Sequence, residues 1–171
     1  MPTRPLTPDE KAYRAALRLL RVQDRSTAEL RARLAKFPPA AVERTIARLV
    51  ASNLLNDDAL ARRIADAAGE RGESHALMRD RARRRSLPAR AAARAIHAAP
   101  TDAALALAAA RAAAARLPAS LDAHARWRRV LGALARRGHD AEASLDAARA
   151  VLGEPPDPSD AHPSDADSAT L

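Results

Sequence analysis

The 171-residue sequence contains no cysteine and only one tryptophan, one tyrosine and one phenylalanine. The absence of cysteine excludes disulfide bonds and thiolate metal sites, and it is compatible with a reducing compartment. The scarcity of aromatic rings argues against a base-stacking surface, which needs several of them. Alanine supplies much of the apolar content. Because alanine favours helix but buries little area, we expect stacked helices rather than a sheet.

Long apolar runs are also missing. The run closest to one, 103–110, ends at Arg111, whereas a membrane-spanning helix needs about 18 consecutive apolar residues. The chain does not open on a charged segment followed by an apolar one, as a secretion signal would. We therefore expect a cytoplasmic protein without a membrane span.

Lysine is rare among the basic residues: Lys11 and Lys36 are the two lysines in a total of 29 lysines and arginines. The formal net charge is +8, yet every charged residue after Gly153 is acidic, so the preceding part is more basic than that value suggests. Such a body should be attracted to polyanions or to acidic protein surfaces. A GC-rich genome enriches arginine and alanine together, so the arginine preference alone is weak evidence for phosphate recognition.

Capping residues, prolines and apolar spacing predict nine helices. Thr7 and Glu10 form a capping box, as do Ser26 and Glu29. Ser120 is expected to cap the eighth helix. The apolar residues expected to face the core of the first, eighth and ninth helices are Tyr13, Leu17 and Leu20, then Trp127, Leu131 and Leu134, and finally Leu145, Ala148 and Leu152.

One segment, 74–87, recurs along the chain. A serine opens it, and Met78 and Ala82 follow on one helical face. Segments about 48 residues earlier and 52 residues later place apolar pairs at the same two positions: Leu30 with Leu34, and Val130 with Leu134. Three copies at intervals of about 50 residues predict a helical repeat, in which each unit buries its apolar face partly against its neighbours.

This periodicity predicts three helical modules with polar ends. The expected order is a disordered N-terminus at 1–6, three-helix modules at 7–53, 54–99 and 100–153, and a disordered acidic tail at 154–171. Asn53 is expected to end its helix in a left-handed conformation, and Asn56 or Asp57 to cap the next.

Several junction motifs resemble those of the RecX family of recombination regulators. Residues 53–58, with Leu60-Ala61 after them, are similar to its Gly-aromatic/Leu-Leu/Ile-Asp/Asn-Asp junction. Residues 71–87 resemble its next turn and Ile-Arg-x-x-Leu helix, and residues 135–139 resemble its last Lys-Gly-Ile turn. The order and spacing of these motifs carry the resemblance. The sequence departs from the family pattern at Asn53 for Gly, Leu60 for Phe, Ala82 for Leu and Ser86 for Gly.

The resemblance covers about residues 12–152 and implies an all-α, elongated, curved array of three tandem three-helix modules. It also implies a non-enzymatic, monomeric partner of the RecA recombinase. Such a protein would bind the RecA–DNA filament along its groove, inhibit or destabilise it, and lower strand exchange and ATP hydrolysis by RecA during homologous recombination and DNA repair. Weak, non-specific contact with single- or double-stranded DNA would accompany this.

Arginines around the recurring segment are the candidate binding residues. Arg79 and Arg81 flank the face of Met78, and guanidinium groups pair bidentately with carboxylate or phosphate. The competing interpretation is a solvated helix face. Recurrence of such residues in the earlier and later copies favours a binding role. The full set expected to contact RecA or DNA is Arg31, Arg33, Arg79, Arg81, Arg83, Arg84, Arg85, Arg128, Arg129, Arg136 and Arg137.

No catalytic or metal-binding pattern is present in the sequence. Asp57-Asp58 has no further carboxylate or histidine at ligand spacing, so capping is the expected role. The five histidines are scattered, and no Gly-rich loop could hold a nucleotide phosphate. We therefore expect neither enzymatic activity nor a cofactor.

Two alternatives to RecA regulation stay open. One is a stand-alone DNA-binding protein of helix-turn-helix type, although the arginines are spread over three modules and base-reading Asn or Gln is scarce. The other is an interaction scaffold for a different acidic partner.

Overall fold

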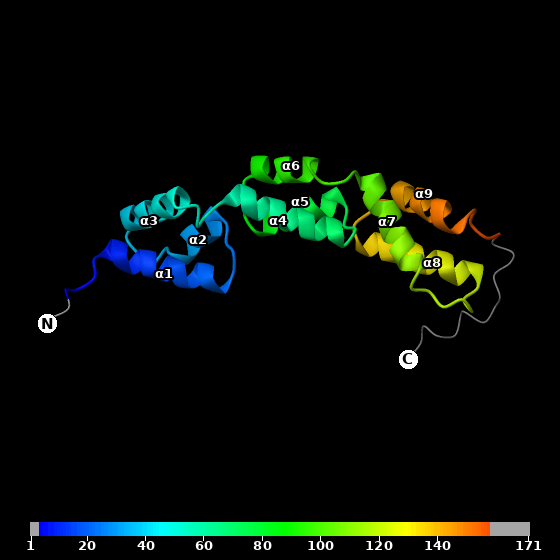
Figure 1. Cartoon of the computed structure of the whole chain (residues 1–171), viewed down its shortest axis with the longest axis horizontal. Helices are drawn as coiled ribbons and strands as arrows, with labels where there is room; N and C mark the ends of the chain where they lie inside the picture. Colours follow the sequence, from blue (N-terminus) through cyan, green and yellow to red (C-terminus); the bar gives the residue numbers. More distant parts are fainter. Residues whose placement is uncertain (1–3, 158–171) are drawn as a thin grey trace. The chain divides into compact units, whose positions relative to one another are not determined.

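The computed structural model describes residues 4–157, and within them the regular elements are nine α-helices without a strand (Figure 1). The all-α prediction is therefore confirmed for this part of the chain. Residues 1–3 and 158–171, which cover most of the predicted disordered ends, lie outside the described residues. The helices are α1 (Pro8–Val22), α2 (Thr27–Arg33), α3 (Pro39–Ala51), α4 (Asp57–Glu70), α5 (His75–Arg84), α6 (Ala89–His97), α7 (Asp102–Ala114), α8 (Ala123–Arg136) and α9 (Ala141–Leu152).

The described residues form two compact units. Residues 4–68 and 75–99 make the first, and residues 69–74 and 100–157 make the second. The predicted ranges 7–53, 54–99 and 100–153 each contain three helices, but their division into separate modules stays a prediction. In the first unit α1 and α2 pack on α3 and α5 packs on α6, while in the second α7, α8 and α9 pack on one another.

Helix starts follow the local capping chemistry. The Thr7 hydroxyl accepts from the Glu10 amide (3.2 Å) and the Thr7 amide donates to the Glu10 carboxylate (2.7 Å), as predicted for α1. Ser26 and Glu29 form the same box before α2. The predicted Ser120 cap is wrong, because α8 begins at Ala123 and the Asp122 carboxylate accepts from the Ala125 amide at 2.7 Å. Each cap satisfies amide groups that have no partner within the helix.

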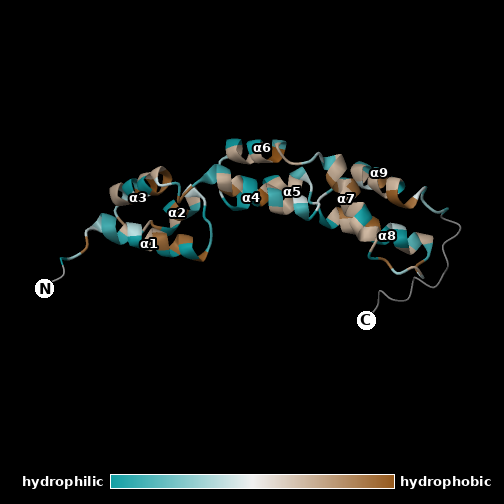
Figure 2. Cartoon of the chain, viewed as in Figure 1, coloured by the Kyte–Doolittle hydropathy of each residue, from teal (hydrophilic) through white to brown (hydrophobic). Residues whose placement is uncertain are grey.

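One core cluster of the first unit contains α2 and α3 side chains against alanines of α1. Leu30 and Leu34 are fully buried, as predicted, and a cluster with Val42, Ile46 and Leu49 surrounds them. In the second unit Trp127, Val130 and Leu134 of α8 pack against alanines of α7 and α9, which confirms the core role of Trp127. Hydrophilic and hydrophobic residues alternate along α1, α3 and α8 (Figure 2). Within the described residues no helix combines the length and apolarity that crossing a bilayer requires.

The predicted inward faces of α1 and α9 are partly wrong. Leu17 and Leu145 are each 37% exposed, whereas neighbouring alanines such as Ala16 and Ala148 are completely buried. The physical reason is that small side chains allow two helices to approach closely, so alanine rather than leucine occupies the centre of these contacts. Tyr13 and Leu20 lie at the edge of the core, where they are only partly buried.

Two of the repeated segments end in the same way. At the end of α5 the Leu87 amide donates to the Ala82 carbonyl (3.1 Å), and at the end of α8 the His139 amide donates to the Leu134 carbonyl (3.2 Å). Both turns need a left-handed residue, which is Ser86 (φ +48°) in one and Gly138 (φ +80°) in the other. These are Schellman caps, in which glycine is usual. Asn53 (φ +55°) ends α3 in the left-handed conformation that the sequence predicted.

Ser86 is therefore a position at which glycine should stabilise the protein. We expect Ser86→Gly to raise the free energy of unfolding by about 0.5–1 kcal/mol, because glycine adopts positive φ without steric cost. Urea unfolding followed by far-ultraviolet circular dichroism measures this. Ser52→Gly is the matched control: Ser52 has φ −87°, so glycine there should only destabilise. Equal effects of the two substitutions would contradict the prediction.

Candidate basic interaction surface

The arginines of α5 lie on both sides of its buried face. Met78 and Ala82 are buried, and Arg79, Arg81 and Arg83 are exposed. Residues four apart lie one turn above each other, so Arg79 and Arg83 follow one side of the helix. Arg81 and Arg84, which is also exposed, are three residues apart and follow the other side. The exposed arginines of α5 thus form two rows, with Arg79 and Arg81 on opposite flanks of the buried face, as their spacing predicted.

Asp80 holds two of these guanidinium groups. Its carboxylate pairs with Arg83 at 3.2 Å and with Arg84 at 2.7 Å, and both arginine side chains are 78% exposed. Exposed pairs of this kind on one helix contribute little to stability. Arg83 and Arg84 can therefore exchange the shared carboxylate for carboxylates or phosphates of a partner at small cost.

Arg85 has an internal role. Its Nε donates to Glu29 Oε1 at 2.7 Å, and its terminal nitrogen donates to Glu29 Oε2 at 3.2 Å and to the Asp24 carbonyl at 2.5 Å. The Arg85 and Glu29 side chains are 31% and 19% exposed. Arg85 therefore ties α5 to the start of α2, and this arginine is engaged inside the first unit.

Glu29 responds to these contacts through its pKa. Partial burial acts to raise the pKa of Glu29, but hydrogen bonds from Arg85 and from the Ser26 amide outweigh it, so the pKa is lowered from its ordinary value. The carboxylate is consequently charged at neutral pH. It serves two contacts at once, the capping box of α2 and the link to α5.

Two predicted binding arginines lie on α2. Arg31 forms a bidentate pair with Glu43 of α3, at 2.7 and 3.1 Å. The hydrogen bond to Glu43 raises the pKa of Arg31, so the guanidinium stays charged. Both partners are about half exposed. Arg33 is exposed and forms no ion pair within residues 4–157.

In the second unit the predicted arginines differ in their contacts. Arg128, Arg129 and Arg136 are exposed on α8. Arg137 is half-buried and binds backbone: its Nε donates to the Arg71 carbonyl and its Nη1 to the Ala133 carbonyl, both at 2.9 Å. Arg137 is thus a structural residue of this unit.

The segment 69–74 is bound to the turn between α8 and α9. The Ser74 amide donates to the Arg137 carbonyl at 2.9 Å, and His139 Nε2 lies 2.9 Å from the Gly72 carbonyl. Gly72 has φ +64°, and a Cβ there would lie 2.9 Å from the Cβ of Ala109. Glycine is therefore required where this segment crosses α7.

Asp57 has a role that sequence reasoning did not identify. Asn56 caps α4, since its side-chain oxygen accepts from the Ala59 amide at 2.9 Å. Asp57 Oδ1 instead accepts from the Thr27 amide at 2.8 Å, at the start of α2. The predicted capping of α4 by the acidic pair is thus performed by Asn56, and the partner of Asp57 is 30 residues away, so no local pattern indicates it.

A basic row on α1 was also missed. Lys11, Arg14, Arg18 and Arg21 are all exposed and follow one another at intervals of three, four and three residues. This spacing places them on one helical face. The spacing is visible in the sequence, but α1 lies outside the recurring segment, so the repeat does not indicate it.

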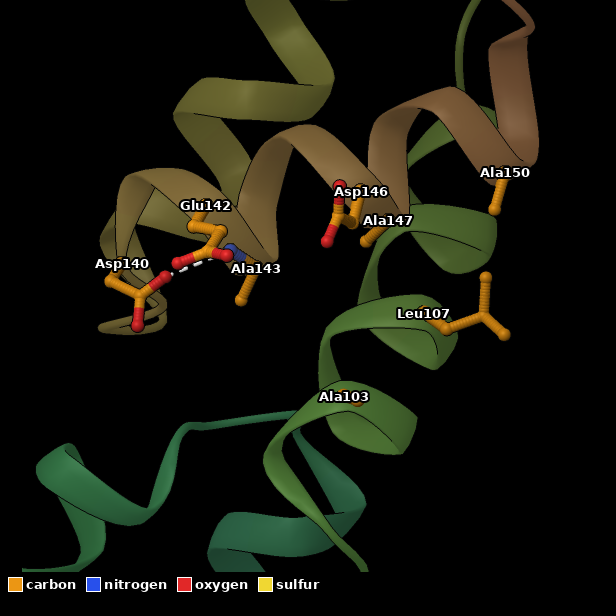
Figure 3. Close-up of a pocket in the computed structure, with 8 residues that line it drawn as sticks. All are labelled: Ala103, Leu107, Asp140, Glu142, Ala143, Asp146, Ala147 and Ala150. Carbon is orange, nitrogen blue, oxygen red and sulfur yellow. Dashed lines mark hydrogen bonds between the residues drawn. The ribbon is translucent and has the colours of Figure 1, made fainter.

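A groove between α7 and α9 is lined by apolar residues and carboxylates (Figure 3). It has a volume of about 360 Å³, an apolar floor including Leu107 and Ala147, and carboxylates at Asp140, Glu142 and Asp146. Its lining contains no histidine and no nucleophilic hydroxyl. Asp140 accepts from the Ala143 amide at 2.8 Å, and within residues 4–157 no group of three or more side chains could hold a metal ion.

Comparison with known proteins identifies the first three helices. Residues 12–49 match the family model described as the first three-helix domain of RecX. The fold is similar to the crystal structure of RecX from Lactobacillus salivarius, with a TM-score of 0.68, 15% identity, and coverage of 84% of this chain and 96% of that one. A second crystal structure, of regulatory protein RecX, matches with a TM-score of 0.62, 20% identity, and coverage of 80% and 70%. No curated protein matches the sequence.

The Arg85–Glu29 link should contribute measurably to stability. We expect Arg85→Ala to lower the free energy of unfolding by about 1–3 kcal/mol, because it leaves a partly buried carboxylate without its charged donor. Chemical denaturation measures the change. The double variant with Glu29→Ala should lose less than the sum of the single variants. Arg31→Ala, which breaks the exposed pair with Glu43, is the control and should change stability little. Additive losses at Arg85 and Glu29 would contradict the link.

The same link should depend on pH. Because the pKa of Glu29 is lowered in the folded state, its stabilising contribution is complete above the ordinary value of 4.5 and is lost as the pH falls through the folded-state value. The wild-type protein should therefore be more stable than Glu29→Gln at neutral pH, and the difference should shrink below pH 4.5. Thermal unfolding at a series of pH values measures this. A constant difference would contradict it.

Proposed function

We propose that this chain, whose residues 12–49 match the first three-helix domain of RecX and whose fold is similar to that of RecX crystal structures, is a non-enzymatic regulator of the RecA recombinase. In this proposal it binds the RecA–DNA filament along its groove and inhibits or destabilises it. Strand exchange and ATP hydrolysis by RecA then fall, which limits homologous recombination and the repair that depends on it.

The observation that carries the proposal is the exposure of the α5 arginines. Arg83 and Arg84 share one carboxylate, that of Asp80. A guanidinium group pairs bidentately with carboxylate or phosphate, so an acidic protein face or a DNA backbone could replace Asp80. The exposed arginines of α2 and α8 add further positive charge in both units.

This mechanism requires no chemistry from the chain itself. A protein that contacts more than one RecA subunit opposes the addition of a subunit or the rearrangement that accompanies hydrolysis. The energy for inhibition then comes from binding alone, because the regulator prefers one filament state over another.

A defined operator would instead favour the helix-turn-helix alternative. The arginines of a helix-turn-helix protein should be concentrated on one recognition helix, whereas exposed arginines lie on helices throughout residues 4–157 of this chain. Sequence-independent binding that weakens steeply with salt agrees with the RecA proposal.

Removal of three α5 charges should weaken the effect on RecA. We expect the combined variant Arg79→Gln, Arg83→Gln and Arg84→Gln to need about tenfold more protein for half-inhibition of RecA ATP hydrolysis on single-stranded DNA. The estimate assumes roughly 0.5 kcal/mol for each exposed ionic contact. Glutamine preserves helix formation, and circular dichroism checks it.

The control removes the same charge elsewhere. Arg62, Arg90 and Arg111 are exposed on α4, α6 and α7 and form no ion pair within the described residues. The combined variant with glutamine at these three positions should inhibit nearly as well as the wild-type protein. Wild-type protein that leaves RecA hydrolysis unchanged over a full titration would refute the proposed function.

A further inference from the structure

The solvent face of α1 carries an unbroken row of cations. Lys11, Arg14, Arg18 and Arg21 are exposed, and their spacing keeps them on one face over a rise of about 15 Å. The helix buries Ala12 and Ala16 on another face, and the buried Ala15 lies at the edge of the row. The row is therefore directed away from the core of its own unit.

No acidic side chain of the described residues neutralises this row. None of the four cations forms an ion pair within residues 4–157. The two acids of α1 are committed elsewhere: Asp9 pairs with Arg44 of α3 at 2.7 Å, and Glu10 receives the Thr7 amide and Arg4. The hydrogen bond from Arg44 lowers the pKa of Asp9, which shows where that carboxylate is engaged.

Several of the predicted binding arginines are instead paired. On α5, Arg83 and Arg84 pair with Asp80 and Arg85 pairs with Glu29, and on α2 Arg31 pairs with Glu43. Those arginines must leave a carboxylate before they bind another anion. The α1 cations have only water and salt ions to release, and release of ions is the main source of free energy when proteins bind nucleic acids.

We propose that Lys11, Arg14, Arg18 and Arg21 form a binding surface for the phosphate backbone of nucleic acid. The cations recur every 4.5–6 Å or so along a straight helix, so a linear polymer with regular negative charge can engage several of them at once. The acidic residues of a protein surface seldom follow such a line. A nucleic acid strand carries one negative phosphate at every nucleotide and so provides such a line of charge.

The surface should bind without sequence preference. Base recognition uses Asn or Gln for adenine and aromatic rings for stacking, and α1 contains neither Asn nor Gln among its residues. Tyr13 is its one aromatic residue, and the Arg48 guanidinium covers its ring at 4.0 Å from the centroid. Phosphate contacts are then the interaction that α1 can make.

The salt dependence of DNA binding tests this surface. The full-length wild-type protein, Arg14→Gln/Arg18→Gln/Arg21→Gln and the Arg62/Arg90/Arg111 glutamine variant are titrated onto fluorescein-labelled oligo(dT) and a duplex at several NaCl concentrations, with fluorescence anisotropy as the readout. Each lost phosphate contact lowers the slope of log K against log[salt] by about 0.7 on single strands and 0.9 on duplex. The α1 variant should therefore lose about 2 from the slope on oligo(dT) and nearly 3 on duplex, while the control keeps the wild-type slope.

Two outcomes would overturn the proposal. One is an unchanged slope for the α1 variant. The other is an equal fall in the control variant, since the slope would then report total charge rather than this row. Because no RecA is present, the result is independent of the proposed function: DNA binding through α1 can be refuted while RecA inhibition persists, and the reverse also holds.

Discussion

Close contact between alanine-bearing helix faces is the constraint on which this structure depends. The core of the second unit contains few large side chains, and in both units completely buried alanines such as Ala16, Ala110 and Ala148 occupy helix contacts. Alanine contributes little buried area, so each contact supplies little hydrophobic free energy. Polar links between helices therefore gain importance. The Arg85–Glu29 and Asp57–Thr27 hydrogen bonds in the first unit are of this kind.

Local signals in the sequence predicted the helices and most of their ends. Capping boxes act over three residues, and the left-handed conformation of Asn53 follows from chemistry within one turn. The buried faces of α1 and α9 were harder to predict. Hydrophobic spacing gives most weight to large residues, so it selected Leu17 and Leu145, which are partly exposed. Where helices pack closely through alanine, the alanines are buried and the neighbouring leucines lie at the edge of the contact.

The arginines could be found from the sequence, but their roles could not. Arg83 and Arg85 lie two residues apart in the same run. One pairs with a neighbour on its own helix, and the other ties two helices together through a glutamate 56 residues away. Only the fold determines which acid an arginine meets. The distribution of carboxylates therefore decides which part of a uniformly basic chain remains available to a partner.

The path of residues 69–74 has a consequence for dissecting this protein. These residues lie between α4 and α5, which belong to the first unit, yet they are part of the second. The polypeptide thus enters the second unit at residue 69, returns to the first at residue 75, and enters the second again at residue 100. A fragment that begins at residue 100 would lack residues 69–74, whose carbonyl groups bind Arg137 and His139. A fragment that ends at residue 99 would contain residues 69–74 without the α8–α9 turn to which they bind. No single cleavage point therefore separates the two units with all their residues.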